Sequence, residues 1–255
     1  MKIGRFDYAV RCFEEALRVQ NDLEVRDYLS RSLVQIGENE RALEELQVMM
    51  DAEPDNKVLP MQAAQVAYLM DDYDRMTEYC DHLLQLDPND AHAHYTYARA
   101  CLGKGDLISA IARLTKCIVL DDHYAEAYLL RGQTLLEMGD VKGAEADANW
   151  LMEHVDEQED VLLLAARVER SKGNTEAAIN LYNKVNEVNP FQIDAYRERG
   201  QLRMAMGDKK GAEEDMKKML ELHPEEVADV SGDYSAEGIE HKVKQAYSAV
   251  NPFGL

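Results

Sequence analysis

Residues 57–90 read KVLPMQAAQVAYLMDDYDRMTEYCDHLLQLDPND, and this stretch decides the fold. Apolar residues recur three and four positions apart on either side of Asp71-Asp72, with Val66, Ala67 and Met70 before it and Tyr79, Leu83 and Leu86 after it. Such spacing places apolar side chains on one side of a helix, so it predicts two short amphipathic helices joined in a hairpin. Pro88 ends the second helix, because proline cannot continue one.

The same pattern returns every 34 residues along the chain. One position holds mostly glycine, which suits the left-handed residue at a helix end: Gly37, Asp71, Gly105, Gly139, Gly173 and Gly207, with Gly4 one residue out of step. Five residues later a small side chain lets two helices approach closely, at Ala42, Ala110, Ala144, Ala178 and Ala212. A period of this length predicts an array of helical hairpins.

These landmarks resemble the tetratricopeptide repeat family over about residues 1–226. The small residue of the family's first helix appears as Ser30, Ala64, Ala98, Gly132, Ala166 and Gly200. The usual early tryptophan is absent, and its position holds Arg26, Pro60, His94, Tyr128, Leu162 and Tyr196. The resemblance implies an all-α fold, a right-handed α-solenoid of tandem helix hairpins.

The frame divides the chain into three parts. Residues 1–22 are expected to form the second helix of an incomplete first unit, with Gly4 at its hairpin turn. Six complete units follow over residues 23–226, at 23–56, 57–90, 91–124, 125–158, 159–192 and 193–226. Residues 227–255 are expected to hold a turn, a capping helix that begins after Ser235, and a short tail. The incomplete first unit indicates a fragment of a longer protein, or an end covered by a partner or a second copy.

The composition narrows the classes of partner. The chain carries 49 acidic and 28 basic residues, a net charge of −21, which disfavours nucleic acid and anionic membranes as partners. A basic or neutral protein fits better, although the acidity also serves simply to keep a long surface soluble. The four cysteines follow no metal-ligand spacing, so we expect free thiols and a reducing, cytoplasmic compartment. No apolar run reaches membrane-spanning length.

The first helices carry the candidate partner-binding groove, because the resemblance implies that they line a concave face. Helical periodicity places three positions of each unit on one stripe of that face, which gives Arg31, Gln65, Tyr68, Tyr95, Arg99, Leu129, Gln133, Leu163, Arg167 and Arg170. Tyrosine and leucine would give apolar contact, arginine would orient the ligand, and glutamine would bond its backbone. The alternative is that Arg99 and Arg167 pair with neighbouring acids such as Glu126 and Asp160.

Two units carry a charged pair that looks structural. Arg131 and Arg199 stand where the other units have Leu29, Ala63, Tyr97 and Ala165. Only these two units have aspartate sixteen residues later, at Asp147 and Asp215. That interval spans the hairpin from first to second helix, so we expect the ion pairs Arg131–Asp147 and Arg199–Asp215, because a half-buried arginine needs a partner.

Catalytic motifs do not appear. His92 and His94 lie two apart, so a helix would send them to opposite sides. No phosphate loop, nucleophile elbow or zinc-helix motif occurs. We therefore expect a scaffold that is not an enzyme, has no metal or cofactor, and binds a peptide or helix of another protein. The alternatives are a structural subunit of a larger assembly, or the substrate-recruiting repeat portion of a longer multidomain protein.

Overall fold

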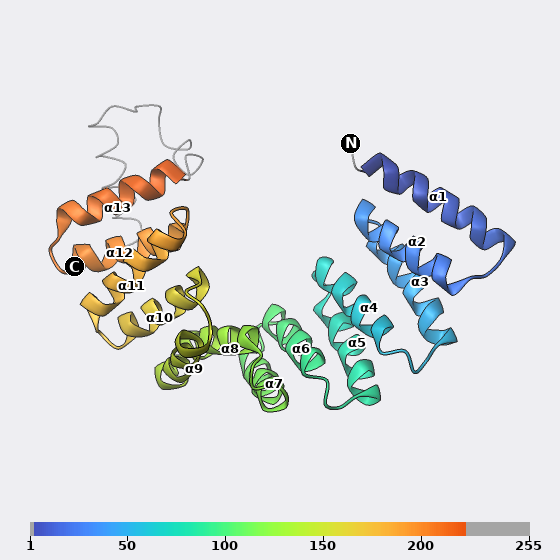
Figure 1. Cartoon of the computed structure of the whole chain (residues 1–255), viewed down its shortest axis with the longest axis horizontal. Helices are drawn as coiled ribbons and strands as arrows, with labels where there is room; N and C mark the ends of the chain where they lie inside the picture. The colour runs from blue at the N-terminus through green and yellow to red at the C-terminus, as the bar shows by residue number, and fades with distance from the viewer. Residues whose placement is uncertain (1–2, 223–255) are drawn as a thin grey trace. The chain divides into compact units, whose positions relative to one another are not determined.

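The computed structural model describes residues 3–222, and every regular element in that range is an α-helix (Figure 1). The helices are α1 (Ile3–Val19), α2 (Leu23–Ile36), α3 (Asn39–Ala52), α4 (Val58–Leu69), α5 (Tyr73–Leu86), α6 (Ala91–Gly103), α7 (Leu107–Leu120), α8 (Ala125–Glu137), α9 (Val141–His154), α10 (Glu159–Ser171), α11 (Thr175–Val188), α12 (Ile193–Ala205) and α13 (Lys209–Leu222). The predicted capping helix and tail of residues 227–255 lie outside the described residues.

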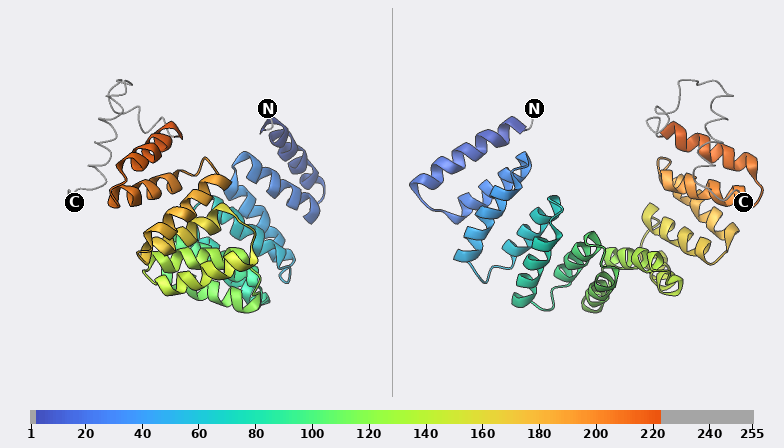
Figure 2. Two further views of the ribbon diagram at one scale, coloured as in Figure 1. Left: turned by 60° about the vertical axis from the view of Figure 1, so that its left-hand side comes forward. Right: turned by 180° about the vertical axis from the view of Figure 1, so that it is seen from behind.

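The chain divides into two compact units, residues 1–134 and residues 135–255. In the first unit, helices α1 to α7 each pack against the next in sequence. In the second unit, α9 to α13 do the same (Figure 2). This sequential packing of short helices confirms the predicted all-α solenoid of hairpins.

The hairpin turns explain the glycine period. At the predicted position φ is 75–84° for the five glycines and 54° for Asp71, so all six are left-handed. At Gly37 the turn is closed by two backbone bonds, from Gly37 N–H to the Val34 carbonyl at 3.1 Å and from Glu38 N–H to the Leu33 carbonyl at 2.9 Å. Such bonds satisfy carbonyls that a helix end leaves free. The prediction for Gly4 is wrong, because α1 begins at Ile3 and its helical hydrogen bonding continues through Gly4.

Aspartates fix where many of the helices begin. Six of them accept a hydrogen bond from a backbone N–H two or three residues later, which satisfies a donor that the first turn leaves free: Asp22, Asp72, Asp90, Asp106, Asp140 and Asp208. Part of the chain's excess of acid is therefore structural.

The small residues of the repeat lie where helices cross. The alanines that open the second helices are all 0% exposed, and the unit that lacks one buries Met76 instead. Around them the bulkier residues of the second helices fill the core, with Met49, Leu83, Cys117, Leu151 and Val185 all buried. Each crossing is thus close at one point and filled by large side chains beside it.

The cysteines behave as small apolar side chains. Cys80, Cys101 and Cys117 are buried, Cys12 is exposed, and all four are free. Burial raises the pKa of Cys80 and of Cys117 to about 12, which keeps both thiols protonated. No helix within residues 3–222 has the length and apolar character needed to cross a membrane.

Candidate functional site

Arg99 and Tyr68 form the clearest feature on the first helices of the first unit. The guanidinium carbon of Arg99, on α6, lies 4.0 Å from the centre of the Tyr68 ring, on α4. Tyr68 is 38% exposed, so this stack is at the surface. Among the described residues Arg99 makes no ion pair, and the alternative pairing with Glu126 does not form. A stacked guanidinium keeps its N–H donors available for an external acceptor.

An aromatic cluster lies beside this stack. The ring centres of Tyr95 and Tyr124 are 5.1 Å apart, and the His92 ring stacks on both. His92 Nδ1 and the Tyr124 hydroxyl are hydrogen-bonded at 2.7 Å. Burial raises the pKa of Tyr95 and of Tyr124, so both hydroxyls stay protonated. The sequence analysis missed Tyr124 because it lies in the loop before α8, outside the helical stripe.

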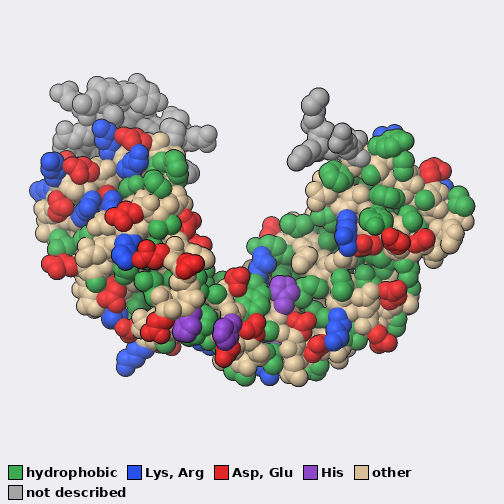
Figure 3. Space-filling model, viewed as in Figure 1, with side chains coloured by type: hydrophobic (Ala, Val, Ile, Leu, Met, Phe, Trp, Pro, Cys, Tyr) green, Lys and Arg blue, Asp and Glu red, His purple; other side chains and the backbone are tan. Residues whose placement is uncertain are grey.

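Two hollows in the first unit are lined in part by residues of α2. One, of about 420 Å³, is lined by Ser30, Arg31, Val34, Gln35, Leu46, Gln62, Gln65, Val66 and Leu69. The other, of about 730 Å³, is lined by Phe6, Ala9, Phe13, Tyr28, Arg31, Ser32 and Gln35. Arg31 and Gln35 border both, and Arg31 is paired with Asp27 at 2.8 Å. The space-filling view shows hydrophobic surface interrupted by charged side chains over α1 to α3 (Figure 3).

In the second unit the predicted arginines are held by acids. Arg167 contacts Glu198 at 3.0 Å through Nε and 2.7 Å through Nη2, and Asp194 at 3.1 Å. Arg170 lies 3.4 Å from Glu198. Arg167 therefore pairs with neighbouring acids, but with two on α12 and not with Asp160.

Tyr182 of α11 also hydrogen-bonds to this group of charged residues. Its hydroxyl donates to Glu198 at 2.7 Å, and the ring is completely buried. Burial and the adjacent Glu198 carboxylate raise the pKa of Tyr182, so the hydroxyl remains a donor. The cluster joins α10, α11 and α12 and satisfies its own charges internally.

Leu163 requires a correction. It was predicted to give apolar contact in the groove, but it is 5% exposed and packs in the core of the second unit. All six residues from Val161 to Ala166 are buried, so this part of α10 has no exposed apolar stripe. Leu129 and Gln133, on α8, are half-buried, whereas Gln65 on α4 is exposed.

The predicted structural arginines have different surroundings. Arg199 donates to Asp215 through Nε at 3.0 Å and Nη2 at 2.5 Å. Arg203 also donates to Asp215, at 2.9 Å. Arg131 donates to Thr115 Oγ1 at 3.2 Å and lies over the Tyr128 ring, and Asp147 is buried.

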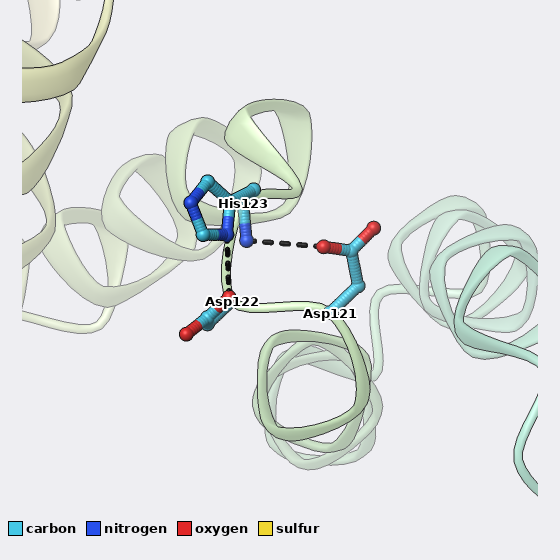
Figure 4. Close-up of side chains that lie close together, drawn as sticks. All are labelled: Asp121, Asp122 and His123. Carbon is cyan, nitrogen blue, oxygen red and sulfur yellow. Dashed lines mark hydrogen bonds and ion pairs between the residues drawn. The ribbon is translucent and has the colours of Figure 1, made fainter.

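One group of possible metal ligands lies in the turn between α7 and α8 (Figure 4). His123 Nδ1 lies 2.5 Å from Asp122, and the His123 backbone N–H donates to Asp121 at 3.1 Å. All three residues are exposed, and their contacts with one another shape the turn. Three exposed side chains in one turn do not by themselves make a metal site.

The two histidines of α6 are separated as predicted, because His92 is exposed and His94 is buried.

One repeat unit of the chain matches a known family model. Residues 159–192 match the model of the tetratricopeptide repeat, and they coincide with one predicted 34-residue unit, now α10 and α11. The chain has the tetratricopeptide-repeat fold. A comparison of the sequence with curated proteins gives no match.

Solved tetratricopeptide-repeat structures share this architecture. PilW, a type IV pilus biogenesis factor, has a TM-score of 0.69 at 16% identity over 87% of this chain and 98% of its own. A tetratricopeptide repeat protein from Parabacteroides merdae has a TM-score of 0.67 at 17% identity, covering 94% and 92%. YrrB, described as having an unusual peptide-binding site, has a TM-score of 0.60 at 16% identity, covering 78% and 97%. At such identities the likeness concerns the fold.

Proposed function

We propose that this chain is a non-catalytic scaffold for protein–protein interaction, binding an extended or helical segment of a partner along the first helices of residues 3–134. The observation that carries the proposal is the Arg99 guanidinium, stacked on exposed Tyr68 and without an acid partner in the described part of the chain. The stack lowers the entropy lost when the arginine binds, because its side chain is already placed.

The neighbouring residues suit such a ligand. Tyr68 and Tyr95 offer large rigid rings with few rotatable bonds, which are favoured as binding anchors. Exposed Gln65 borders the hollow of about 420 Å³ and can bond a peptide backbone through its amide. On α8, Leu129 would add apolar contact, and Gln133 would bond the peptide backbone as Gln65 does. YrrB supports the proposal because it is a protein of this fold that is described as binding a peptide.

The charge of the chain defines the partner further. A net charge of −21 attracts a basic partner at long range and does not repel a neutral one, while Arg99 supplies a local contact for a backbone carbonyl or a carboxylate. The free cysteines fit a reducing, cytoplasmic setting. In the second unit Arg167 and Arg170 are held by Glu198, so they contribute less to the proposed contact than Arg99 does.

Selection of peptides from a random display library against the whole chain tests the proposal. Peptides that bind the wild type should lose at least tenfold in affinity with the variant Tyr95→Ala/Arg99→Ala, measured by fluorescence anisotropy. The matched control is Glu78→Ala/Asp81→Ala, two exposed residues of second helix α5, which should leave affinity unchanged. Circular dichroism shows whether both variants keep their helices. Peptides that bind the groove variant as tightly as the wild type would refute the proposed surface.

A further inference from the structure

Helix α7 is the second helix of its hairpin, and it carries an exposed, mainly apolar stripe that includes none of the residues of the proposed groove. The α7 stripe consists of Ile108, Ala112, Thr115 and Val119, all exposed. Their spacing of four, three and four residues keeps them within about 60° around the helix, along about 16 Å of its length. Ile108 is 72% exposed and Val119 is 73% exposed, so neither side chain contributes much to the core.

The repeats provide an internal control for this stripe. Steps of 34 residues give the equivalent positions on the second helices α3, α5, α9, α11 and α13. At the position of Ile108 these helices carry Glu40, Asp74, Lys142, Glu176 and Lys210, all exposed. At the position of Val119 they carry Asp51, Gln85, Glu153, Glu187 and Glu221, also exposed. The fold therefore accepts charged or polar side chains at both positions, and packing does not require isoleucine and valine there.

The charges around the stripe also differ from those of the chain as a whole. Helix α7 reads LISAIARLTKCIVL and contains no acidic residue, in a chain whose net charge is −21. Arg113 lies over the Tyr97 ring at 3.8 Å, while Lys116 is exposed beside the stripe and makes no ion pair within residues 3–222. Asp106 precedes the helix and Asp121 follows it. The Thr115 hydroxyl of the stripe accepts a hydrogen bond from Arg131 of α8 at 3.2 Å. The surface is thus mainly apolar, with positive charge from Lys116 and Arg131 near its centre and negative charge at both ends.

We propose that the α7 stripe docks the apolar face of an amphipathic helix of a partner protein. That helix would be about three to four turns long, to match α7, with an acidic residue opposite Lys116 and basic residues near its ends. Exposed apolar side chains grouped on one helix face are typical of interaction sites, and a helix laid against them buries side chains at the same three- and four-residue spacing.

A second copy of the chain is a poorer occupant. Two α7 helices packed antiparallel about their centres would place Asp106 of each copy near Asp121 of the other. Each chain also carries a net charge of −21, so association of two copies opposes strong repulsion at low salt. The charge pattern of α7 is complementary to a helix with the reverse pattern and not to itself.

A designed helix of this chemistry tests the assignment. The probe is a fluorescein-labelled 14-residue peptide with leucine at four positions spaced four, three and four, glutamate at the centre and lysine near both ends. Fluorescence anisotropy with the full chain should show saturable binding, weakened at least tenfold by Ile108→Glu/Val119→Glu. Both substitutions introduce residue types found at equivalent positions, so the variant should keep its helical circular dichroism. The control Val188→Glu, on exposed α11 surface, should leave binding unchanged.

Charge exchange gives an independent check on the same complex. Lys116→Glu should weaken binding of the glutamate-centred peptide and strengthen binding of a version with lysine at the centre. Absence of saturable binding, or equal affinity for the wild type and the double variant, would overturn the proposal. Dimers of the wild type in sedimentation equilibrium that dissociate in Ile108→Glu/Val119→Glu would assign the stripe to a second copy and overturn it as well.

Discussion

At the scale of single residues, the hairpin turns impose the strictest backbone requirement. Five turns use glycine, and the sixth places Asp71 at a φ of 54°, which few side chains adopt readily. The Tyr73 hydroxyl donates to the Asp71 carboxylate at 2.9 Å, a local bond that offsets part of the strain. Asp71 is thus tolerated because a short polar side chain can bond locally in this conformation.

Gly173→Ala should destabilise the second unit by about 1–2 kcal/mol, because a Cβ raises the energy of the left-handed conformation. A Cβ at this glycine would meet nothing within 4 Å, so the loss reports backbone strain and not a clash. Urea unfolding followed by circular dichroism measures it, with the exposed Ser171→Ala as control. Asp71→Gly should be neutral or stabilising in the same assay. Equal stability of Gly173→Ala and the wild type would contradict the argument.

At the scale of elements, ion pairs join first helices to second helices inside one hairpin. Asp215 of α13 accepts from both Arg199 and Arg203 of α12, and Arg199 also donates to Asn183 at 2.7 Å. The Asp215 carboxylate is almost completely buried, so its charge depends on these two donors in place of water.

Asp215→Ala should therefore destabilise the α12–α13 hairpin by about 3–5 kcal/mol, because it leaves Arg199 buried without its acid. The double variant Arg199→Leu/Asp215→Ala should lose less, since the buried charge of Arg199 is removed together with its acid. Arg203 also loses Asp215 in both variants, but it is half-buried and keeps Asp208 at 3.9 Å and the Gly211 carbonyl at 3.3 Å. Thermal unfolding of both variants measures the comparison. A double variant less stable than Asp215→Ala would show that the pair itself is strongly stabilising. The Arg131–Asp147 pair stays a prediction, open to the same comparison.

The sequence predicts the elements better than it predicts which charges are free. The 34-residue period locates the hairpins because turn and close-contact positions each demand particular side chains. Arg99 and Arg167 are equivalent in that period, yet one is stacked on tyrosine and the other is paired. The difference depends on the next first helix, where the residue 31 positions later is Leu130 in one unit and Glu198 in the other. Periodicity within one unit cannot reveal a partner in the following unit.

Leu163 shows the second limit of sequence reasoning, again at the scale of an element. It lies in a run of six buried residues, Val161 to Ala166, so the apolar positions of α10 surround the helix instead of forming one stripe. A stripe is informative only where polar residues mark the other side. The sequence therefore supports the proposed groove better on α4 and α6, where exposed Gln65 and half-buried Arg99 interrupt the apolar pattern.

At the scale of the whole molecule, stability in a repeat array is a sum of local contributions. Helices in each unit pack mainly against their neighbours in sequence, so loss of one core side chain should weaken only the adjacent hairpins. This differs from a globular domain, in which one shared core couples distant segments.

Leu46→Ala in α3 and Leu164→Ala in α10 test that locality as a reciprocal pair. Both leucines are fully buried, so each cavity should cost about 2–5 kcal/mol. Hydrogen exchange read by mass spectrometry should speed up in α2 to α4 for Leu46→Ala and leave α10 to α13 at wild-type rates. Leu164→Ala should give the opposite pattern, because it removes contacts of the second unit only. Faster exchange throughout the chain in either variant would mean that the two units unfold as one, and that the nearest-neighbour description of this array is wrong.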